Sequence, residues 1–590
     1  MSNEEYQKII DEIASLPSGG ITYKNINGKD YAYYQWRENG KQRSRRAKDD
    51  ELEMLLIQVE RRKELESFLK GIVSGANKHL RVDSPFHCGV RMGKDLERFI
   101  RPVENWAKRE CIQSLRDYIY GNVSDRVFIL YGLRRTGKTT LIRQLIMEMD
   151  EQMRNKTVFI QIQDGRTLDE VHQDLKRLED NGYKYVFIDE VTMLDDFIEG
   201  AALFSDIFAA SGMKIVLSGT DSLGFMFAED EELYDRCIMC HTTYIPYREF
   251  ERVLGIKGID DYIRYGGTMS LGGQEYNPNA LIFATRKSTQ EYVDSAIARN
   301  IQHSLKNYQY EGHFRSLRDL YEKDELTSAI NRVVEDMNHR FTLEVLTRDF
   351  KSNDLSISAM NLRKDREHPN DILDRVDIPR VRTVLKGLLE IKDKKEQRIE
   401  LQDAHCIEIK EYLDMLDLTA EIENRWTSDY NRRETRTVFS QPGMRYSQAE
   451  ALIMSLMRDE KFRDMSLEER KWVMQRILTE IKGRMMEDIV LLETQMARRN
   501  CEVFRLQFPV GEFDMVVFDM EQGTCELYEI KHSAQIAPEQ YRHLIDERRC
   551  KETAFRYGNI IRRCVIYRGE TTEVDGVTYW NVEEYLKTLS

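Results

Sequence analysis

The chain has 590 residues, of which 41% are hydrophobic and 32% charged, and its formal net charge is −14. One hydrophobic core cannot hold a chain of this length, so we expect about three to five domains. The acidic balance argues against a protein that coats nucleic acid along its whole surface, and leaves room for local basic patches only. The acidic, amphipathic start of the chain is unlike a signal or transit peptide, and no apolar run approaches the roughly 18 residues of a membrane span. Nine scattered cysteines suit a reducing compartment, so we expect a cytoplasmic protein without a membrane partner.

The first 80 residues predict a small unit of their own. Residues 1–20 predict a short helix, and strands then flank turns at Asn27-Gly28 and Asn39-Gly40, which gives a three-stranded meander. A charged helix is expected over residues 49–70. The basic and aromatic residues of the meander would suit phosphate contacts with base stacking. The alternative is a solvated sheet face beside an aromatic mini-core.

The stretch VFILYGLRRTGKTTLIRQ, residues 127–144, carries the strongest motif. Apolar residues predict a buried strand before it and a helix after it. Between them lies G-x-x-x-x-G-K-[ST], whose glycines let backbone N–H groups surround a phosphate at a helix N-terminus. Lys138 would then reach the β and γ phosphates, and the Thr139 hydroxyl would bind Mg²⁺. The sequence therefore predicts an ATP–Mg²⁺ site, with binding residues Gly132, Arg134, Arg135, Thr136, Gly137, Lys138, Thr139 and Thr140.

An acidic pair follows the apolar strand at residues 185–188 of the same unit. We expect Asp189 to hold Mg²⁺ and Glu190 to orient and polarise the attacking water. Alone, such a pair could cap a helix, but its place after a phosphate loop favours catalysis. Ser218 and Thr220 end the next strand and are candidate sensors of the γ-phosphate, with ordinary strand-end residues as the alternative. Further elements are expected at residues 103–119, a helix started by Pro102, at 157–162, a strand, and at 168–179, a helix.

The run Cys237-Ile238-Met239-Cys240-His241 formally matches the attachment pattern of c-type haem. That attachment requires export, which the start of the chain does not suggest. The apolar residues inside the run predict instead a strand over 237–245 with buried core thiols. Arg236 ends the preceding helix, where oligomeric ATPases often place an arginine that reaches a neighbour's nucleotide. A structural ion pair is the alternative role for Arg236.

Residues 246–340 are mostly helical in pattern, and residues 341–407 mix helices with short apolar segments. A turn is expected at 262–267 and a helix at 408–417. Residues 382–389 have the look of the second helix of a winged-helix unit.

The C-terminal part carries a second chemical signal. A helix at 483–493, strands at 503–508, 512–518 and 525–530, a helix at 540–549 and a strand at 564–567 give the order αβββαβ. Asp514 and Glu529-Ile530-Lys531 have the D…E-x-K spacing of metal-dependent nucleases. Two carboxylates on adjacent strands can bind one Mg²⁺ or Mn²⁺, with Glu487 completing the ligands, and Lys531 can deprotonate water or stabilise a pentacovalent phosphate. The alternative is a solvated salt-bridge cluster on a scaffold that does not cut.

Together these segments resemble the bacterial and archaeal AAA+ ATPases that carry a C-terminal domain of formerly unknown function. The likeness spans about residues 90–570 and rests on GLRRTGKTT, YVFIDEV, LSGTDSL, YDRCIMCHTTYIPYREF, YIRYGGTM, YVDSAIARNI, FSQPGMRY, GRMMEDIVLLET and GEFDMVV…ELYEIKHS. The resemblance implies a restriction-endonuclease-like, PD-(D/E)XK, fold at the C-terminus, with site residues Glu487, Asp514, Glu529 and Lys531. The family usually has glycine where this chain has Asp235. It also usually has a proline soon after the Gly-Gly of its turn, where this chain has Thr268. Both departures leave the ATPase core intact.

We therefore expect an α/β multidomain protein. Its domains would be an N-terminal unit (1–80), an AAA+ P-loop core (81–252), a helical lid (253–340), a winged-helix-like segment (341–430) and a nuclease-like domain (431–590). The leading hypothesis is an ATP-hydrolysing protein, self-associated as a ring or dimer, whose nucleotide cycle gates DNA access to the carboxylate site. Genome maintenance, mobile elements and phage defence all fit. The alternatives are an ATP-driven switch whose C-terminal domain binds a partner without cutting, and a nucleic-acid-binding signalling ATPase.

Overall fold

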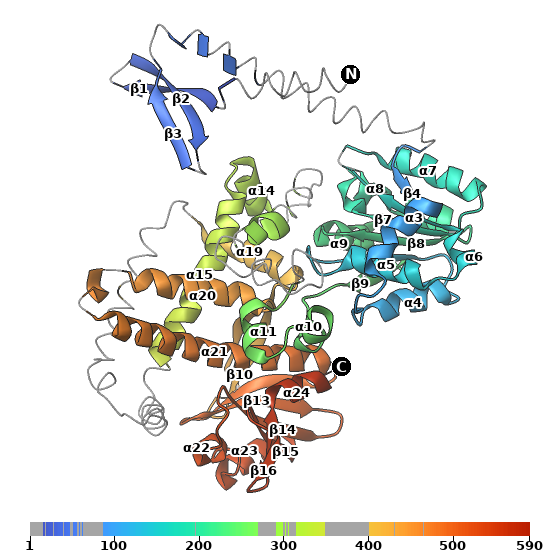
Figure 1. The fold of residues 1–590 in the computed structure, drawn as a ribbon. Helices are drawn as coiled ribbons and strands as arrows, with labels where there is room; N and C mark the ends of the chain where they lie inside the picture. The colour runs from blue at the N-terminus through green and yellow to red at the C-terminus, as the bar shows by residue number, and fades with distance from the viewer. Residues whose placement is uncertain are drawn as a thin grey trace. The chain divides into compact units, whose positions relative to one another are not determined.

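The computed structural model has two compact units, Met1–His87 and Cys88–Ser590 (Figure 1). The predicted helices at 1–20 and 382–389 fall almost wholly outside the residues that the structure describes. The described residues are 16–17, 19–26, 29–38, 41–47, 51–52, 54–55, 58–59, 62, 86–163, 165–194, 196–268, 289, 291–298, 301, 305, 314–348, 387, 401–429, 431–458, 460–463 and 465–589.

The first unit is built on the predicted meander, which the structure confirms. The three strands pair antiparallel in the order β1-β2-β3. A small core of Ala32, Ala47 and Leu55 lies against them, and the described residues between 51 and 62 are helical, in agreement with the predicted charged helix. The strands are β1 (Gly19–Ile26), β2 (Lys29–Glu38) and β3 (Lys41–Arg46).

A six-stranded sheet opens the second unit, in the order β4-β6-β7-β8-β5-β9. All neighbours are parallel except the edge strand β4, which runs antiparallel to β6. The inner strands are apolar because helices cover both faces. β8 separates β5 from β7, so the phosphate motif and the acidic pair follow two strands that end at the same edge. The strands are β4 (Gly89–Arg91), β5 (Val127–Tyr131), β6 (Thr157–Gln161), β7 (Tyr185–Asp189), β8 (Lys214–Gly219) and β9 (Cys237–His241).

The helices around this sheet differ from prediction at one place. The expected helix at 103–119 is wrong in its first half, because α4 begins only at Ile112 and Pro102 lies in the short 3-10 turn η1. The N–H of Glu110 donates instead to Glu249 Oε1, at 2.8 Å, so it is not available for a helical bond. The helices are α3 (Gly93–Ile100), η1 (Arg101–Val103), α4 (Ile112–Tyr120), α5 (Lys138–Glu148), α7 (Leu168–Asp180), α8 (Phe197–Gly200) and α9 (Ser222–Glu231).

A helical layer follows the core. The predicted turn at 262–267 is wrong for its first four residues, which end α11, and only Gly266 and Gly267 turn. The predicted helix at 408–417 is confirmed as α19, although it begins five residues earlier. Helices α15, α20 and α21 lie side by side. The helices are α10 (Tyr247–Leu254), α11 (Ile259–Tyr265), η4 (Val293–Ala298), α14 (Arg315–Glu322), α15 (Leu326–Arg348), α19 (Asp403–Met415), α20 (Pro442–Leu456) and α21 (Leu467–Ala497).

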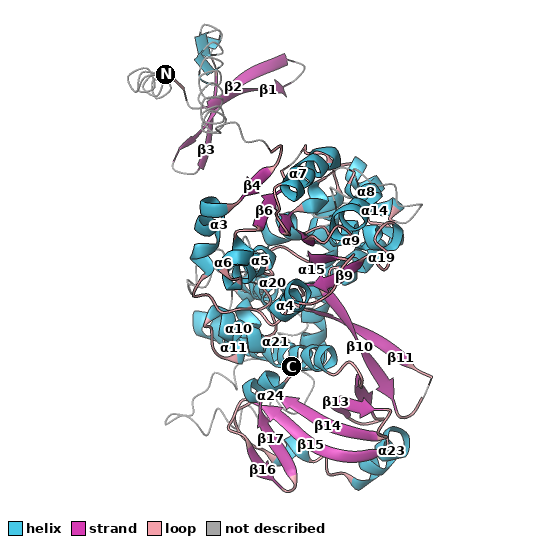
Figure 2. Ribbon diagram, turned by 90° about the vertical axis from the view of Figure 1, so that its right-hand side faces the viewer, coloured by secondary structure: helices cyan, strands magenta, loops and turns pink. Residues whose placement is uncertain are grey.

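An eight-stranded sheet closes the chain, in the order β11-β10-β12-β13-β14-β15-β17-β16 (Figure 2). One face packs on α21, and the other carries α22 and α23. The predicted αβββαβ order is confirmed except at its second helix, because the helix expected at 540–549 is divided into α22 and α23 by the non-helical residues 542–546. Strands β10 and β11 form an antiparallel hairpin. This hairpin joins the sheet because β10 pairs parallel with β12. The elements are β10 (Thr419–Trp426), β11 (Arg433–Phe439), β12 (Glu502–Gln507), β13 (Glu512–Asp519), β14 (Thr524–Lys531), α22 (Pro538–Tyr541), α23 (Glu547–Tyr557), β15 (Asn559–Tyr567), β16 (Thr572–Val574), β17 (Val577–Asn581) and α24 (Val582–Thr588).

Within the described residues, no helix combines the length and the apolar character that a membrane crossing would require.

Candidate functional site

The phosphate motif forms a tight loop between β5 and α5. Gly132 has φ +135°, and a Cβ there would lie 2.4 Å from the carbonyl oxygen of Thr242, so the close approach requires glycine. Gly137 caps α5 in the left-handed region at φ 96°. Arg135 also takes a positive φ, of 67°. The sequence thus bends the backbone around the position of the next residue, Lys138.

Lys138 is buried inside this loop. Its Nζ donates hydrogen bonds to the carbonyl oxygens of Gly132, at 2.7 Å, and Leu133, at 2.8 Å. Burial lowers the pKa of Lys138 to about 8, although Glu190 and Asp189 act in the opposite direction. The ammonium group is held by neutral partners, so its charge remains available to an incoming anion.

The acidic pair lies against the loop, as predicted. Thr139 Oγ1 donates to Asp189 Oδ2, at 2.8 Å, and Ser218 Oγ donates to Asp189 Oδ1, at 2.5 Å. Glu190 follows in a left-handed conformation and accepts a bond from Thr220 Oγ1, at 3.2 Å. Burial, and then the charge of Asp189, raises the pKa of Glu190. Asp189 thus accepts bonds from two hydroxyls, those of Thr139 and Ser218, and Glu190 accepts one from Thr220.

A buried arginine supports the loop from behind, and sequence patterns missed it. Arg109 donates to the Thr136 carbonyl, at 2.8 Å, and pairs with Glu249, at 2.6 Å. Thr136 Oγ1 contacts Thr242 Oγ1, at 2.8 Å. Arg109 and Glu249 lie 140 positions apart, so no local motif joins them. Arg134 and Arg135 are exposed on the loop, and Thr140 is half-buried in α5.

Arg236 lies at the amino-terminal end of the parallel strands, whereas the phosphate loop follows their carboxyl ends. It directly precedes β9, whose first residue pairs with Val127 at the amino end of β5. Its Nε lies 3.4 Å from Asp206 Oδ1, and its Nη1 donates to the Glu232 carbonyl. The five residues of β5 span about 16 Å, so Arg236 cannot reach the phosphate loop of its own chain. A role at a neighbour's nucleotide stays a prediction.

The cysteine run forms strand β9, as predicted, but its thiols are only half-buried. Burial raises the pKa of Cys237 to about 11 and of Cys240 to about 12, which disfavours the thiolate that a metal requires. His241 stacks on Tyr131, with ring centroids 4.5 Å apart, and its Nδ1 lies 2.8 Å from Asp417 Oδ2. The end of β9 is thus fixed beside the phosphate loop.

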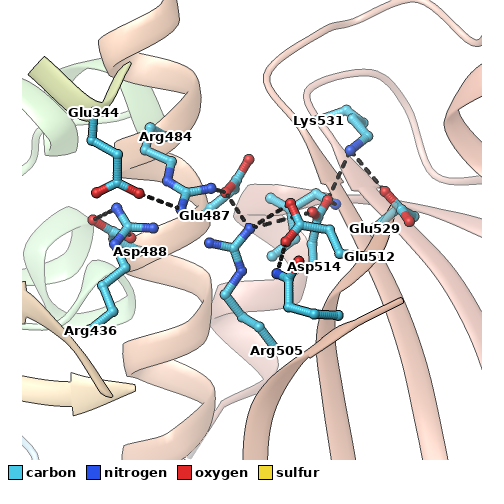
Figure 3. A network of polar contacts seen from close by, with 12 residues as sticks. Glu344, Arg436, Arg484, Glu487, Asp488, Arg505, Glu512, Asp514, Glu529 and Lys531 are labelled. Carbon is cyan, nitrogen blue, oxygen red and sulfur yellow. Dashed lines mark hydrogen bonds and ion pairs between the residues drawn. The ribbon is translucent and has the colours of Figure 1, made fainter. Parts of the chain in front are cut away.

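The D…E-x-K residues meet on neighbouring strands β13 and β14 (Figure 3). Lys531 Nζ lies 2.8 Å from Asp514 Oδ2 and 2.8 Å from Glu529 Oε2. The N–H of Ile530 also donates to Asp514 Oδ2. Glu529 and Lys531 share a strand face because side chains alternate along a strand. Both carboxylates are buried, so this is not the solvated cluster of the alternative interpretation.

Burial and neighbouring charges both shift the pKa values of the side chains in this cluster. Burial would raise the pKa of Asp514, but Lys531 and Arg505 outweigh it and hold that pKa at about 2. Burial, and then Asp514, raises the pKa of Glu529 well above its usual range. Desolvation would lower the pKa of Lys531, but Asp514, Glu529 and Glu487 raise it well above its ordinary value. One carboxylate is therefore firmly ionised, while its neighbour holds a proton more readily.

Glu487 reaches the cluster from α21, but two arginines contact it. Arg484 Nη1 lies 2.6 Å from Glu487 Oε2, and Arg505 Nη2 lies 3.6 Å from the same oxygen. Arg505 is almost fully buried and also pairs with Glu512, at 2.9 Å, and lies 3.9 Å from Asp514. Sequence patterns missed Arg505, since a lone arginine inside an apolar strand carries no motif. Burial raises the pKa of Glu487.

Comparison with known proteins identifies two segments. Residues 124–251 match the family model of an AAA domain, and residues 2–56 match a domain of unknown function, DUF6788. Residues 124–251 of this chain therefore form an AAA domain. The uncharacterized protein MJ1544 of Methanocaldococcus jannaschii is 22% identical over 256 residues, which are 39% of this chain and 55% of that protein. The chain thus matches about half the length of this curated relative.

Two solved structures match parts of the chain weakly. C. elegans PCH-2 has a TM-score of 0.17 at 19% identity, over 27% of this chain and 43% of that one. The Aeropyrum pernix Orc1 protein, solved in complex with DNA, has a TM-score of 0.20 at 12% identity, over 61% of this chain and 94% of that one.

The AAA domain's residues fit a nucleotide with Mg²⁺. The Thr139 hydroxyl and the Asp189 carboxylate meet within 2.8 Å and supply the hard oxygen donors that Mg²⁺ prefers. Lys138 supplies the positive charge for phosphates.

The donor set on β13 and β14 fits a divalent ion in part. Asp514 and Glu529 supply carboxylate oxygens, and Glu529 Oε1 is buried with no hydrogen-bond partner in the part of the chain that the structure describes. Glu487 is occupied by its arginines, however, and the described residues include no group of three His, Cys, Asp or Glu side chains placed to hold a metal. Asp514 and Glu529 would be the first ligands, and Glu487 would join only after leaving Arg484 and Arg505.

Proposed function

We propose that this protein is an ATPase whose nucleotide cycle controls a metal-dependent nuclease-like site that acts on DNA. The observation that carries the proposal is the buried cluster of Asp514, Glu529 and Lys531, supported by a helix that also contacts the ATPase side of the chain. Two acidic oxygens beside a lysine suit phosphodiester hydrolysis, in which negative charge develops on phosphate oxygens.

On the ATPase side, each predicted residue has a stated task. Lys138 binds the β and γ phosphates, and Thr139 and Asp189 hold Mg²⁺, which neutralises developing charge when bound. Glu190 orients the attacking water, and its raised pKa suits a group that accepts a proton near neutral pH. Ser218 keeps Asp189 in place through its hydrogen bond.

On the nuclease-like side, the residues act on a phosphodiester. Asp514 remains ionised and Glu529 accepts a proton more readily, so the pair offers one fixed anion and one proton acceptor. Lys531 stabilises negative charge on the phosphate. A divalent ion at Asp514 and Glu529 would supply an activated water and polarise the phosphate.

Helix α21 supports the link between the two sites. It carries Glu487 and, six residues later, Glu493. Glu493 Oε1 accepts hydrogen bonds from the Tyr247 N–H, at 2.8 Å, and the Tyr262 hydroxyl, at 2.9 Å. Tyr247 begins α10, which follows the last strand of the AAA sheet. A movement of α10 or α11 would therefore displace the helix that presents Glu487.

A second set of contacts runs from the phosphate loop to the same helix. The Tyr292 hydroxyl donates to the Arg134 carbonyl, at 3.4 Å, and accepts from Gln441 Nε2, at 2.9 Å. Gln441 caps α20, in which Arg445 Nη1 binds Asp488 Oδ2, at 3.0 Å. Asp488 is next to Glu487 on α21. Buried contacts of this kind can pass a change of loop conformation to the carboxylates.

The proposal is tested by incubating the protein with plasmid, linear and single-stranded DNA plus Mg²⁺ or Mn²⁺, with and without ATP. We expect the wild type to cut at least one substrate and the Asp514→Ala, Lys531→Ala double variant to cut none. Lys551→Ala, on an exposed lysine of α23, is the matched control and should cut normally. If the double variant and the wild type behave alike on every substrate, the nuclease proposal fails.

A second candidate function is an ATP-driven switch whose C-terminal domain binds DNA or a protein without cutting. The observation that favours it is the closed state of the carboxylates, because Lys531 bridges Asp514 and Glu529 and two arginines hold Glu487. In the same assay, this function predicts ATP turnover that responds to a partner while all DNA remains intact. Lys138→Ala should abolish that response by removing nucleotide binding.

A further inference from the structure

Asp260 of α11 contacts a cluster of three basic side chains. Its Oδ1 lies 3.1 Å from His532 Nε2 and 3.3 Å from Lys482 Nζ. Its Oδ2 lies 2.5 Å from Arg568 Nη2. One carboxylate thus faces three groups that are able to bind an anion, and we refer to Lys482, His532 and Arg568 as the basic triad.

The basic triad belongs to the same sheet and helix as the nuclease-like carboxylates. Lys482 lies on α21, five residues before Glu487, and His532 directly follows Lys531. Arg568 directly follows β15, which runs parallel to β14 with Lys531 paired to Tyr567. Strands β14 and β15 therefore end side by side, and the triad lies at the edge where the D…E-x-K strand ends.

The positive charges around Asp260 outnumber its single negative charge. Lys482 and Arg568 together bring two formal positive charges to the single negative charge of Asp260. The hydrogen bond from His532, and the charges of Lys482 and Arg568, lower the pKa of Asp260 despite burial. His532 Nδ1 is buried and has no hydrogen-bond partner among the described residues. The side chains of Lys482 and Arg568 are 27% and 37% exposed, so a ligand from solvent can reach them.

A carboxylate and a phosphodiester offer similar partners to these donors, since each presents two oxygens that share a negative charge. Contacts of Lys and Arg with backbone phosphates supply most of the sequence-independent affinity for DNA. We propose that the basic triad is a binding site for a nucleic-acid backbone phosphate beside the carboxylates, and that Asp260 fills this site in the conformation seen here. This inference rests on the proposed function, because it deepens the DNA side of it.

The position of Asp260 links this site to the ATPase. Its helix α11 begins at Ile259, whose N–H donates to Glu583 Oε1, at 3.0 Å. The same helix carries Tyr262, whose hydroxyl donates to the Ile245 carbonyl, just beyond β9. A movement of α11 would withdraw Asp260 from the triad, and α11 is attached to the segment that leaves the AAA sheet. DNA binding would therefore compete with the α11 contact.

The test measures binding of a labelled DNA duplex to the full chain by fluorescence anisotropy, in chelator so that no cutting occurs. Asp260→Asn removes the competing charge and keeps the side-chain shape. We expect it to raise affinity roughly tenfold and to make the salt dependence steeper, since freed cations release more counterions. Glu547→Gln removes the same charge from the exposed surface of α23 and should leave binding unchanged.

Two further substitutions probe the triad itself. Adding Lys482→Ala and Arg568→Ala to Asp260→Asn should remove the gained affinity and lower the salt slope by about two. A circular dichroism spectrum and a single cooperative thermal unfolding transition like those of the wild type would show that these variants fold. If Asp260→Asn binds DNA as the wild type does, or if the triad variant keeps the gain, the phosphate site is refuted. If the wild type never cuts DNA but Asp260→Asn binds more tightly, only the nuclease proposal fails.

Discussion

The two candidate sites both place a lysine beside two acidic residues, but they balance its charge in opposite ways. Lys138 donates to two neutral carbonyls, and its pKa is lowered to about 8. Lys531 bridges two carboxylates, and its pKa is raised well above its ordinary value. The first site keeps an uncompensated positive charge for a phosphate. In the second site the positive charge of Lys531 is balanced by the two carboxylates that it contacts.

The acidic pairs resemble each other more closely than the lysines do. In each pair burial raises the pKa of the glutamate, Glu190 in the AAA domain and Glu529 in the C-terminal sheet. In each pair the aspartate accepts hydrogen bonds, from hydroxyls at Asp189 and from Lys531 and a backbone N–H at Asp514. Environments that give two neighbouring carboxylates different pKa values suit a site in which one carboxylate binds a metal ion and the other transfers a proton. Under the proposed function both sites would serve hydrolysis, but in the second site Lys531 bridges the two carboxylates.

The largest expected effect tests the first site. Glu190→Gln removes the proton acceptor but keeps the side-chain shape, so ATP should still bind while turnover falls about 10,000-fold, the upper end of what a positioned base contributes. The measurement is steady-state phosphate release together with binding of a fluorescent nucleotide. Glu199→Gln, on the exposed surface of α8, is the matched control and should turn over normally. Normal turnover by Glu190→Gln would mean that another group orients the water. The similarity between the two acidic pairs would then give no support to a catalytic role for Glu529.

The sequence predicted the parts of each site that are local. The phosphate loop is contiguous, so one strand, one glycine-bounded turn and one helix define it, and the structure has all three. The alternation of a strand likewise places Glu529 and Lys531 on one face. These local rules need no knowledge of the tertiary fold.

The parts that depend on distant segments were not predictable. Arg109 supports the loop through Glu249, 140 positions away, and Arg505 holds Glu487 from a different element. The parallel pairing of β10 with β12 likewise joins segments about 80 residues apart. The predicted helix at 103–119 failed for the same reason, because a bond from the Glu110 N–H to Glu249 outweighs local helix propensity.

A smaller effect is expected at Arg236, which tests whether the first site is complete within one chain. Arg236→Ala should leave nucleotide affinity unchanged, because this side chain lies at the opposite end of the parallel strands from its own phosphate loop. If a neighbouring chain uses it, turnover should fall at least about 1,000-fold, as for other arginine fingers, and wild-type turnover should rise with protein concentration. Arg126→Ala, which breaks the nearby pair with Asp235, is the control. Turnover that is unaffected by Arg236→Ala would assign this arginine to its ion pair with Asp206.

The smallest effect concerns Glu493, on the helix between the two sites. Burial raises the pKa of Glu493 to about 7, although the bonds from Tyr247 and Tyr262 act in the opposite direction. An unfolded glutamate has a pKa of about 4.3. Between these values the folded protein holds a proton that the unfolded chain has lost, so this group makes stability fall as pH rises from about 4 to about 7. Above pH 7 the loss is complete.

Glu493→Gln removes this pH dependence because glutamine does not titrate and can still accept the bonds from Tyr247 and Tyr262. Relative to the wild type, the variant should be more stable above pH 7 by up to about 3 kcal/mol, with little difference near pH 4. Thermal unfolding midpoints at acidic and alkaline pH measure this, with Glu547→Gln as the exposed control. An equal shift at both pH values would mean that Glu493 is ionised in the folded protein. The bond between Glu493 of α21 and Tyr262 would then involve an ionised carboxylate. It would resemble the ion pairs of Lys531 more than the bonds of Lys138 to neutral carbonyls.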